Sequence, residues 1–430
     1  MTIPSNVETN DDVINTFEKL NLIPELLNRI TDLGFHQPTP IQLKAIPTIL
    51  KGLDLIAGAN TGSGKTATFA LPILQKLYLE KQAEEFSVKA TDAMAKGNHV
   101  SHLILVPTRE LAQQVGNNIN SYAAHFNGAV KIQTVFGGVS VNKQMQALRG
   151  GTDILVATPG RLIDLISSNA IKLDLVKTLV LDEADRMLNL GFSEELTALL
   201  RKLPSKKQTL LFSATFPEQV ENLTKDLLQN PVEIQLQNHE SSTLVQRVFT
   251  VNKGEKTVVL ERLIKQHNWR QVLIFVNAKK HCEYLASKLA KRGISAEVFH
   301  GDKGQGQRNR VIDGFKAGEI DVLIATDIAA RGLDIAKLPV VINFNLPRSP
   351  LDYMHRIGRS GRAGEVGLAI SLIDYEDFHQ FSVIEKKNKI RLTREELPGF
   401  EVTEVGSVYL DSSKPMAKPE GSGKKKKKQK

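Results

Sequence analysis

The sequence predicts an α/β protein in which two parallel-sheet domains of unequal size are joined by a flexible linker. Short apolar runs rich in Val, Ile and Leu alternate with longer amphipathic segments along the chain of 430 residues. Such runs are typical of strands buried on both faces, and helices between them indicate a parallel sheet. Several runs end in small or polar residues, and open α/β sheets bind ligands at the carboxyl ends of their strands. We therefore expect a ligand site where these runs end.

The apolar runs, taken in order, divide between the two domains. The first domain is expected to hold strands at residues 53–57, 103–106, 154–157, 179–181 and 210–212. The second is expected to hold strands at residues 272–276, 322–325, 340–344 and 368–372. A polar stretch without an apolar period separates them and is typical of a linker. The predicted boundaries are a disordered N-terminus at 1–16, a first domain at 17–236, a linker at 237–244, a second domain at 245–397 and a Lys-rich tail at 398–430.

Composition excludes several classes of protein. Hydrophobic residues make up 41% of the chain and charged residues 24%, which is ordinary for a soluble globular protein. The single cysteine, Cys282, excludes an intrachain disulfide and any multi-cysteine metal site, and it fits a reducing compartment. No apolar run reaches the ~18 residues of a membrane span, and the start lacks the features of a secretory signal. We therefore expect a cytoplasmic protein without a membrane partner.

The basic charge is concentrated at one end of the chain. The formal net charge is +9, and the last twenty residues alone contribute +6 through eight lysines set against Asp411 and Glu420. A tail of this composition is either a solvated disordered segment or a non-specific contact for a polyanion such as a nucleic acid. Composition leaves both interpretations open.

A phosphate-binding loop follows the first apolar run. Residues 59–66 open an apolar helical segment, which is the context that such a loop requires. Its glycines let backbone N–H groups point at phosphate oxygens, and the helix N-terminus adds a favourable dipole. Lys65 is expected to reach the β and γ phosphates, and the Thr66 hydroxyl to bind Mg²⁺. The alternative is a plain Gly/Ser turn before a helix. The residues predicted to hold the nucleotide are Ala59, Asn60, Thr61, Gly62, Ser63, Gly64, Lys65 and Thr66.

Acidic residues follow the apolar run at residues 179–181. Asp182 comes directly off this expected strand, so its carboxylate is placed to hold Mg²⁺ together with Thr66. Glu183, one residue further on, is placed to orient or deprotonate the attacking water. Asp185 completes the group. The alternative is a solvated acidic loop, which the buried strand and the phosphate loop disfavour.

This pattern resembles the DEAD-box RNA helicases. Asp182-Glu183-Ala184-Asp185 and the phosphate loop carry the resemblance, which covers roughly residues 17–362 in the order of the family's motifs. The other matching motifs lie at residues 34–42, 107–111, 137–138, 158–161, 213–215, 325–334 and 355–362. Residues 135–142 and 148–151 further resemble the bacterial RhlE-type branch. The resemblance implies two tandem RecA-like domains, ATP and Mg²⁺ as cofactors, and RNA as the partner.

The resemblance implies that Phe17, Gln37 and Gln42 read the adenine base and that Asp334 contacts the ribose. A glutamine amide can pair bidentately with the N6 and N7 edge of adenine, as in DNA recognition, so Gln42 would select ATP over GTP. Phe17 would stack on the base. The structural alternatives are a core position for Phe17 and a helix-surface position for Gln42.

The second domain has no phosphate loop of its own, so one ATP site would be shared across the cleft between the domains. The resemblance implies that Arg359 and Arg362 act there as arginine fingers, an effect worth roughly 10³–10⁵ in rate. Ser349 and Pro350 predict the start of a helix that ends near Gly358, so the alternative role of Arg359 is a cation at a helix C-terminus, worth ~0.3–1 kcal/mol. The resemblance assigns the coupling of ATP to RNA to Ser213, Thr215, Asp185 and His355.

The resemblance also implies RNA contacts on both domains. Contacts to the backbone, with the 2′-OH separating RNA from DNA, would make binding tolerant of sequence. The residues implied are Pro107, Thr108, Arg109, Gly138, Thr158, Gly160, Arg161, Arg308 and Thr326. This chain departs from the family's pattern at residues 304–308, Gly-Gln-Gly-Gln-Arg, where many members carry a Ser and a Glu-Arg pair. The departure concerns the RNA contacts of that loop.

The leading hypothesis is an ATP-dependent RNA helicase with a monomeric catalytic unit. ATP and RNA would each favour the closed state and raise the affinity for the other, and closure would separate a short duplex locally without processive movement. Two alternatives remain, a DNA-preferring superfamily 2 translocase and an ATP-gated RNA clamp without productive unwinding. A GTPase is disfavoured because the sequence contains no Asn-Lys-x-Asp guanine motif.

Overall fold

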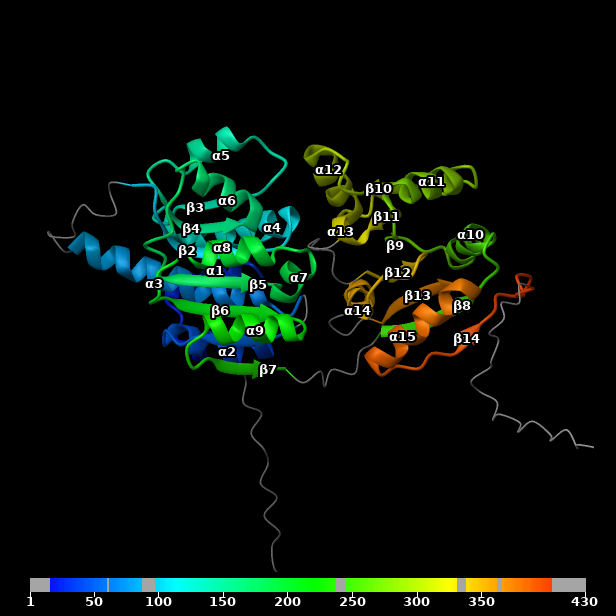
Figure 1. Ribbon diagram of the computed structural model, residues 1–430, viewed down its shortest axis with the longest axis horizontal. Helices are drawn as coiled ribbons and strands as arrows, with labels where there is room; N and C mark the ends of the chain where they lie inside the picture. The colour runs from blue at the N-terminus through cyan, green and yellow to red at the C-terminus, as the bar shows by residue number, and fades with distance from the viewer. Residues whose placement is uncertain are drawn as a thin grey trace, which may run out of the picture.

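The computed structural model describes residues 16–59, 62–86, 97–236, 244–330, 338–361 and 366–403. It shows two α/β domains side by side, each built around a seven-stranded sheet (Figure 1). Every strand pair in these sheets is parallel, which confirms the predicted fold class. Nearly all of the predicted N-terminus, linker and tail lie outside the described residues. No helix in the described part of the chain has the length and apolar character needed to cross a bilayer.

The sheet of the first domain has the strand order β3-β4-β2-β5-β6-β1-β7. Its strands are β1 (Leu55–Gly58), β2 (Val100–Leu105), β3 (Ile132–Val135), β4 (Thr152–Ala157), β5 (Thr178–Asp182), β6 (Gln208–Ser213) and β7 (Val232–Gln235). The five predicted strands of this domain are its five interior strands. The two edge strands, β3 and β7, were missed because most of their side chains are only partly buried, so they carry no continuous apolar run.

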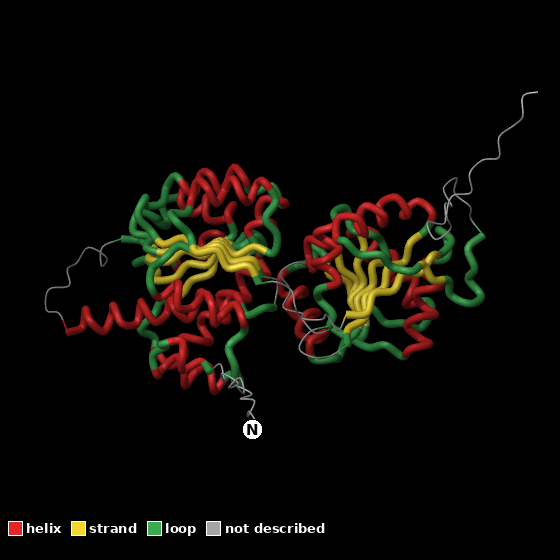
Figure 2. Tube along the Cα trace, turned by 90° about the horizontal axis from the view of Figure 1, so that it is seen from below, coloured by secondary structure: helices red, strands yellow, loops and turns green. Residues whose placement is uncertain are grey.

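Helices cover both faces of this sheet (Figure 2). One face packs against η1 (Phe17–Leu20), α1 (Pro24–Asp32), α2 (Pro40–Leu50), α3 (Lys65–Phe86), α4 (Arg109–Tyr122) and η2 (Ala123–Phe126). The other packs against α5 (Val141–Ala147), α6 (Pro159–Ser167), α7 (Ala184–Asn189), α8 (Ser193–Leu200) and α9 (Glu218–Leu227). Most of these helices start just after a strand, so their first residues lie at the carboxyl edge of the sheet.

The sheet of the second domain has the order β10-β11-β9-β12-β13-β8-β14. Its strands are β8 (Leu244–Thr250), β9 (Val272–Val276), β10 (Glu297–Phe299), β11 (Val322–Thr326), β12 (Val340–Asn343), β13 (Gly367–Ile373) and β14 (Arg394–Glu395). The four predicted strands, β9, β11, β12 and β13, are four of the five interior strands. The three missed strands are short or partly exposed. β10 and β14 form the edges, and β8 lies between β13 and the two-residue β14, with its first four residues only partly buried or exposed.

Two layers of helices also enclose the second sheet. One face packs against α10 (Lys256–His267) and α11 (Lys279–Ala290). The other packs against α12 (Gln305–Lys316), α13 (Asp327–Ala330), α14 (Pro350–Ile357) and α15 (Phe378–Asn388), and η3 (Tyr375–Asp377) directly precedes α15. The predicted helix start at Ser349 is confirmed, since its hydroxyl accepts a hydrogen bond from the Asp352 N–H at 3.1 Å. Cys282 is fully buried between α11 and the sheet, and burial raises the pKa of its thiol to about 12.

Candidate functional site

The phosphate-loop segment connects β1 to α3 at the carboxyl edge of the first sheet. The Ala59 N–H donates to the carbonyl of Ser213 at 3.0 Å, which ties the start of the loop to the end of β6. The Lys65 ammonium donates to the carbonyl of Ala59 at 3.0 Å and lies 3.8 Å from Oδ1 of Asp182. Thr66 follows in the first turn of α3. Asn60 and Thr61 were also predicted to bind the nucleotide and lie outside the described residues.

Gly64 combines a left-handed backbone with a close contact to the side chain of Gln42. Its φ of +91° lies in the left-handed region, and a Cβ placed there would come within 2.6 Å of Nε2 of Gln42. Gln42 sits in the first turn of α2, where its Oε1 accepts from the Thr39 N–H at 2.8 Å and its Nε2 donates to the carbonyl of Gly64 at 3.2 Å. The buried amide of Gln42 therefore contacts the phosphate loop directly, rather than lying on a helix surface.

The other predicted adenine contacts lie in different environments. Phe17 is 7% exposed and packs into the core of the first domain, the alternative position considered for it. Gln37 is exposed just before α2. Asp334 lies outside the described residues. Of this predicted set, the structure brings only Gln42 into contact with the phosphate loop within the described part of the chain.

Asp182 ends β5 in a buried position. Burial raises the pKa of its carboxyl to about 6, Glu183 and Asp185 add to the shift, and Lys65 opposes it. Its Oδ1 is buried without a hydrogen-bond partner, which is costly for an oxygen that nothing else will engage. Mg²⁺ is held by one or two carboxylates together with hydroxyl, water and phosphate oxygens, so Asp182 and Thr66 suit this ion. Among the described residues no group of three acidic, His or Cys side chains forms a fuller cage.

Glu183 has an unusual backbone and a buried counterion. Its φ and ψ of 55° and 51° lie in the left-handed region, immediately before α7 begins. Its carboxylate forms an ion pair with Arg186, one turn further along the chain. Burial raises the pKa of Glu183, but the charges of Arg186, Lys65 and Arg359 together outweigh burial and hold it at about 2. Glu183 is therefore a carboxylate at neutral pH.

Asp185 joins α7 to the segment that follows β6. Its Oδ2 accepts from both the N–H of Thr215 at 3.0 Å and the hydroxyl of Thr215 at 2.7 Å. Its own N–H donates to the hydroxyl of Ser213 at 3.2 Å, and that hydroxyl donates to the carbonyl of Thr215 at 2.7 Å. The three predicted coupling residues of the first domain thus form one hydrogen-bonded unit, which also contacts the phosphate loop through Ala59.

A pocket between the domains brings the fourth coupling residue to this unit. It is lined by Lys65, Glu183, Asp185, Arg186 and Ala214 of the first domain and by His355 and Arg359 of the second. Burial lowers the pKa of His355, against the opposing charges of Asp185 and Glu183. Arg362 was also predicted to act here and lies outside the described residues. One pocket therefore collects acidic, basic and imidazole groups from both domains.

Arg356, a neighbour of these residues in sequence, has a different role. Its guanidinium forms a bidentate ion pair with Asp327, with hydrogen bonds of 2.6 and 2.7 Å. It also donates to Asn277, to Asn343 and to the carbonyl of Asn345. Arg356 is fully buried inside the second domain, so it anchors α14 to the sheet and takes no part in the pocket.

The predicted RNA contacts of the first domain gather at the ends of neighbouring strands. Arg109 lies against the Gly137–Gly138 turn, so closely that a Cβ at Gly138 would come within 1.9 Å of its Nη1. Arg161 donates to the carbonyl of Val139 at 3.1 Å and to Gln144 at 2.8 Å. The Thr108 hydroxyl caps the start of α4 by accepting from the Leu111 N–H at 3.3 Å, and Thr158 precedes α6 without a side-chain cap; Pro107 and Gly160 lie beside them in sequence. Thr326 ends β11 in the second domain.

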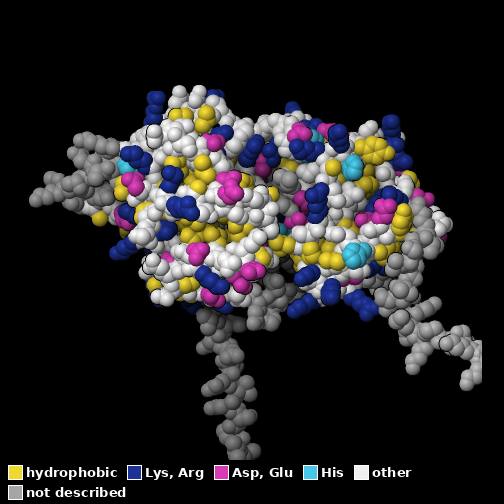
Figure 3. All heavy atoms as spheres, in the orientation of Figure 1, with side chains coloured by type: hydrophobic (Ala, Val, Ile, Leu, Met, Phe, Trp, Pro, Cys, Tyr) yellow, Lys and Arg dark blue, Asp and Glu magenta, His cyan; other side chains and the backbone are white. Residues whose placement is uncertain are grey.

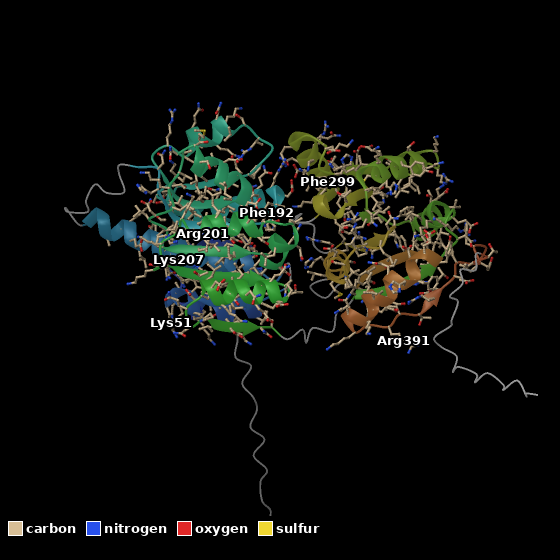
Figure 4. All side chains as sticks on the ribbon, in the orientation of Figure 1. Lys51, Phe192, Arg201, Lys207, Phe299 and Arg391 are labelled. Carbon is tan, nitrogen blue, oxygen red and sulfur yellow. The ribbon has the colours of Figure 1, made fainter. Side chains whose placement is uncertain are left out.

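Two contacts join α4 of the first domain to α12 of the second. Arg308 forms an ion pair with Glu110, and Nε2 of Gln305 lies 3.5 Å from Oε1 of Gln113. The Arg308 guanidinium also lies 5.1 Å from the ring centroid of Phe299, which Figure 4 shows on the side of the second domain nearest the first. The RNA contact expected of Arg308 stays a prediction. Sequence reasoning missed this pairing, because it depends on which surfaces of the two domains meet.

A shared pocket with one phosphate loop defines the class of protein: a two-domain nucleotide hydrolase whose site is completed by its second domain. Family models narrow the class. The model described as DEAD/DEAH box helicase matches residues 39–223, and the helicase conserved C-terminal domain matches residues 255–364. The chain belongs to the DEAD-box family of ATP-dependent RNA helicases.

Curated relatives and solved structures agree with this assignment. The chain is 37% identical over 400 residues to the ATP-dependent RNA helicase CshA of Listeria monocytogenes, covering 93% of this chain and 74% of the relative. It is 36% identical over 414 residues to the DEAD-box ATP-dependent RNA helicase RhpA of Helicobacter pylori, covering 95% and 80%. The Saccharomyces cerevisiae Dbp5 structure bound to RNA and ADP BeF3 matches with a TM-score of 0.73 and 31% identity, covering 89% of this chain and 96% of that one. The implied RecA-like fold is confirmed, whereas the RhlE-type branch stays a prediction.

Proposed function

We propose that RNA stimulates ATP hydrolysis at the pocket between the domains, and that closure of the domains separates short RNA duplexes locally. The observation that carries this proposal is the composition of the pocket, which takes Lys65 and Glu183 from one domain and His355 and Arg359 from the other. A site assembled from two domains makes turnover depend on their approach. Anything that favours the approach, including RNA bound to both domains, would then raise the rate.

The first domain would bind the nucleotide and prepare the water. Lys65 and the loop N–H groups would hold the phosphates, and Thr66 and Asp182 would hold Mg²⁺, which supplies positive charge to the phosphate oxygens when bound. The Oδ1 of Asp182, which accepts no hydrogen bond, supports this role. Glu183, kept ionised by its cationic neighbours, would accept a hydrogen bond from the attacking water and orient it.

The second domain would complete the site. Arg359 reaches the pocket from just beyond the end of α14 and would stabilise the charge that builds up on the transferred phosphoryl group, together with Arg362. Its position in the pocket supports this over a helix-capping role alone. Phe17, Gln37, Gln42 and Asp334 would bind the adenosine part of ATP, and Gln42 is the member of this set whose contact with the phosphate loop supports the role.

The hydrogen-bonded unit of Asp185, Ser213 and Thr215 would couple the two events. Ser213 contacts the phosphate loop through its carbonyl, and Asp185 faces His355 across the pocket. A shift in either the loop or the second domain would therefore move the same unit. RNA would lie along the carboxyl edges of both sheets, where Arg109, Arg161 and Thr326 lie, and the RNA bound in the similar Dbp5 structure supports RNA as the partner.

The test combines an ATPase assay and a strand-displacement assay on the full chain. We expect RNA oligomers to raise the ATPase rate and DNA oligomers of the same sequence to raise it less. Glu183→Gln should still bind ATP and RNA but neither hydrolyse nor unwind. Equal stimulation by DNA would favour the translocase alternative. Stimulated hydrolysis without any displacement of a short duplex would favour the RNA clamp.

A further inference from the structure

The outward face of α11 combines an aromatic ring with basic side chains. Helical spacing places Lys280, Tyr284, Lys288 and Lys291 on the side opposite to the buried Cys282, Leu285 and Leu289. Tyr284 is 58% exposed, although most large hydrophobic side chains of the described residues are buried. Figure 3 shows basic and hydrophobic side chains together over this helix. We call Lys280, Tyr284, Lys288 and Lys291 the α11 stripe.

Tyr284 is held in a defined position on this face. The Lys288 ammonium lies 5.3 Å from the centroid of the Tyr284 ring, a cation–π contact one helical turn away. The contact covers one side of the ring with a cation and leaves the residue largely exposed. An exposed ring beside a positive charge can stack on an unpaired base of a single strand, while the lysines bind the phosphates of the same strand.

The acidic groups around the α11 stripe are already paired. Glu283 on the flank of α11 binds Lys303 at 2.7 Å and His300 at 3.0 Å, and Asp302 binds Lys279. On the neighbouring α10, Glu261 binds Arg292 at 2.8 Å. Within the described part of the chain, neither Lys280 nor Lys291 has an ion-pair partner. The lysines of the stripe therefore present uncompensated positive charge.

The α11 stripe begins at the edge of the sheet where the proposed RNA site lies. α11 follows β9, whose neighbour β11 ends at Thr326, and the next residue after β9, Asn277, bonds to Arg356 of α14. From that edge the helix runs along the sheet away from its carboxyl end. A polynucleotide that leaves the edge beside Thr326 would meet Lys280 first, then Tyr284 and Lys288, then Lys291.

We propose that the α11 stripe binds single-stranded RNA that extends beyond the site between the domains, with one base on Tyr284 and phosphates along the three lysines. This proposal rests on the proposed function, because it needs RNA at the carboxyl edge of the second sheet. The α11 stripe would extend the RNA-binding surface, and it lies outside the ATP pocket. RNA long enough to reach it would bind more tightly than RNA confined to the edge.

The test measures binding and ATPase stimulation by oligouridylates of about 8 and about 24 nucleotides, lengths within and beyond the ~4–16 nucleotides of a typical single-strand site. For the wild-type chain, the longer RNA should half-saturate at a lower concentration. Tyr284→Ala should weaken binding of the longer RNA about fivefold or more, the loss expected of one stacked base. Binding of the shorter RNA should not change.

The lysines are tested separately through salt. Replacing Lys288 and Lys291 by Gln should reduce the slope of log affinity against log salt by about 1.4 for the longer RNA, about 0.7 for each phosphate that is no longer neutralised. Tyr284→Phe should bind like the wild type, because the ring is retained. The matched control is Tyr375→Ala, an exposed tyrosine of η3 whose hydroxyl donates to Glu376, outside the α11 stripe.

The outcomes separate this inference from the proposed function. Equal losses for both RNA lengths, or no loss for either, would overturn the role of the α11 stripe while RNA stimulation of the wild type persists. If neither RNA length loses affinity, the α11 stripe would more readily bind a different partner, such as an acidic protein surface. A wild-type chain that neither RNA stimulates would overturn the proposed function and this inference with it.

Discussion

Glu110 and Arg308 form an ion pair across the boundary between the domains, although 198 residues separate them in the chain. Both side chains are largely buried, at 11% and 6% exposure. A buried pair contributes little when formed, but removing one partner costs about 3–5 kcal/mol because it leaves a charge without a counterion. Here that cost falls on the approach of two domains rather than on the folding of either.

We expect Glu110→Gln and Arg308→Gln to lower RNA-stimulated ATPase activity by similar factors. Because each variant removes the same pair, the double variant should be no worse than the single variants. Melting temperatures should change little. If Arg308 instead contacts RNA, as the sequence predicted, Arg308→Gln alone will weaken RNA binding and Glu110→Gln will not.

Arg359 and Arg356 offer a matched comparison within one helix end. Arg359→Ala should reduce ATP hydrolysis by about 10³-fold or more, the range measured for arginine fingers, with little change in melting. Arg356→Ala should lower the free energy of unfolding by about 3–5 kcal/mol, because the half-buried Asp327 would lose its partner and Asn277, Asn343 and Asn345 would lose their hydrogen bonds. Thermal melting and ATPase rates separate the two effects. A purely thermal defect in Arg359→Ala would contradict its assignment to the pocket.

We expect the ionised carboxylate of Asp182 to lower the stability of the fold although ATP hydrolysis requires it. Its raised pKa, about 6, means that the folded state holds the proton more tightly than the unfolded chain does. Protonated Asp182 therefore contributes its full stability to the folded state below about pH 4, and this contribution is lost as the pH rises through 6. Asp182→Asn should abolish hydrolysis yet raise the free energy of unfolding at pH 7.5 by on the order of 1–3 kcal/mol.

Melting of wild type and Asp182→Asn between pH 4 and 8 checks this expectation, since the difference should shrink toward the acidic end. The control is Asp153→Asn, because Asp153 is paired with Lys81 at 2.7 Å and with the Lys131 N–H at 2.6 Å, so its loss should destabilise the fold. An Asp182→Asn variant that melts below the wild type at pH 7.5 would contradict the prediction.

Gly64→Ala should abolish ATP binding. The new Cβ would meet Nε2 of Gln42 at 2.6 Å, and the left-handed backbone adds strain of about 1–2 kcal/mol. Gly128→Ala is the matched control, since Gly128 has a φ of +79° and no heavy atom within 4 Å of the added Cβ. We expect the control to lose some stability and to keep its affinity for ATP, as measured with a fluorescent nucleotide. If both variants lost the same affinity for ATP, the strain of a left-handed alanine, rather than the contact with Gln42, would explain the loss.

Nine of the ten interior strands of the two sheets were predictable, because burial on both faces leaves a continuous apolar run in the sequence; the exception, β8, is partly exposed over its first half. Runs such as Val272–Val276 have no polar residue to place at a surface, so they can only be central strands. The edge strands Ile132–Val135 and Val232–Gln235 carry polar residues toward solvent and look like loops. Sequence pattern therefore defines the middle of a parallel sheet better than its margins.

The candidate site was predictable for a different reason. Lys65, Asp182 and Glu183 lie in short motifs whose residues act within one loop or one turn, so local sequence carries their chemistry. The ion pair of Glu110 with Arg308 depends on which surfaces of two domains meet, and no local pattern specifies that. The deep burial of Arg356 likewise follows from Asp327 and three asparagines spread over several strand ends.

The sealed position of Cys282 has a practical consequence. Because the chain's only thiol is fully covered and its pKa is raised to about 12, maleimide reagents should leave it unmodified in the native protein. One cysteine introduced on the surface of each domain could then carry a fluorophore or spin label without replacement of Cys282. Distances between such labels would follow opening and closing in solution.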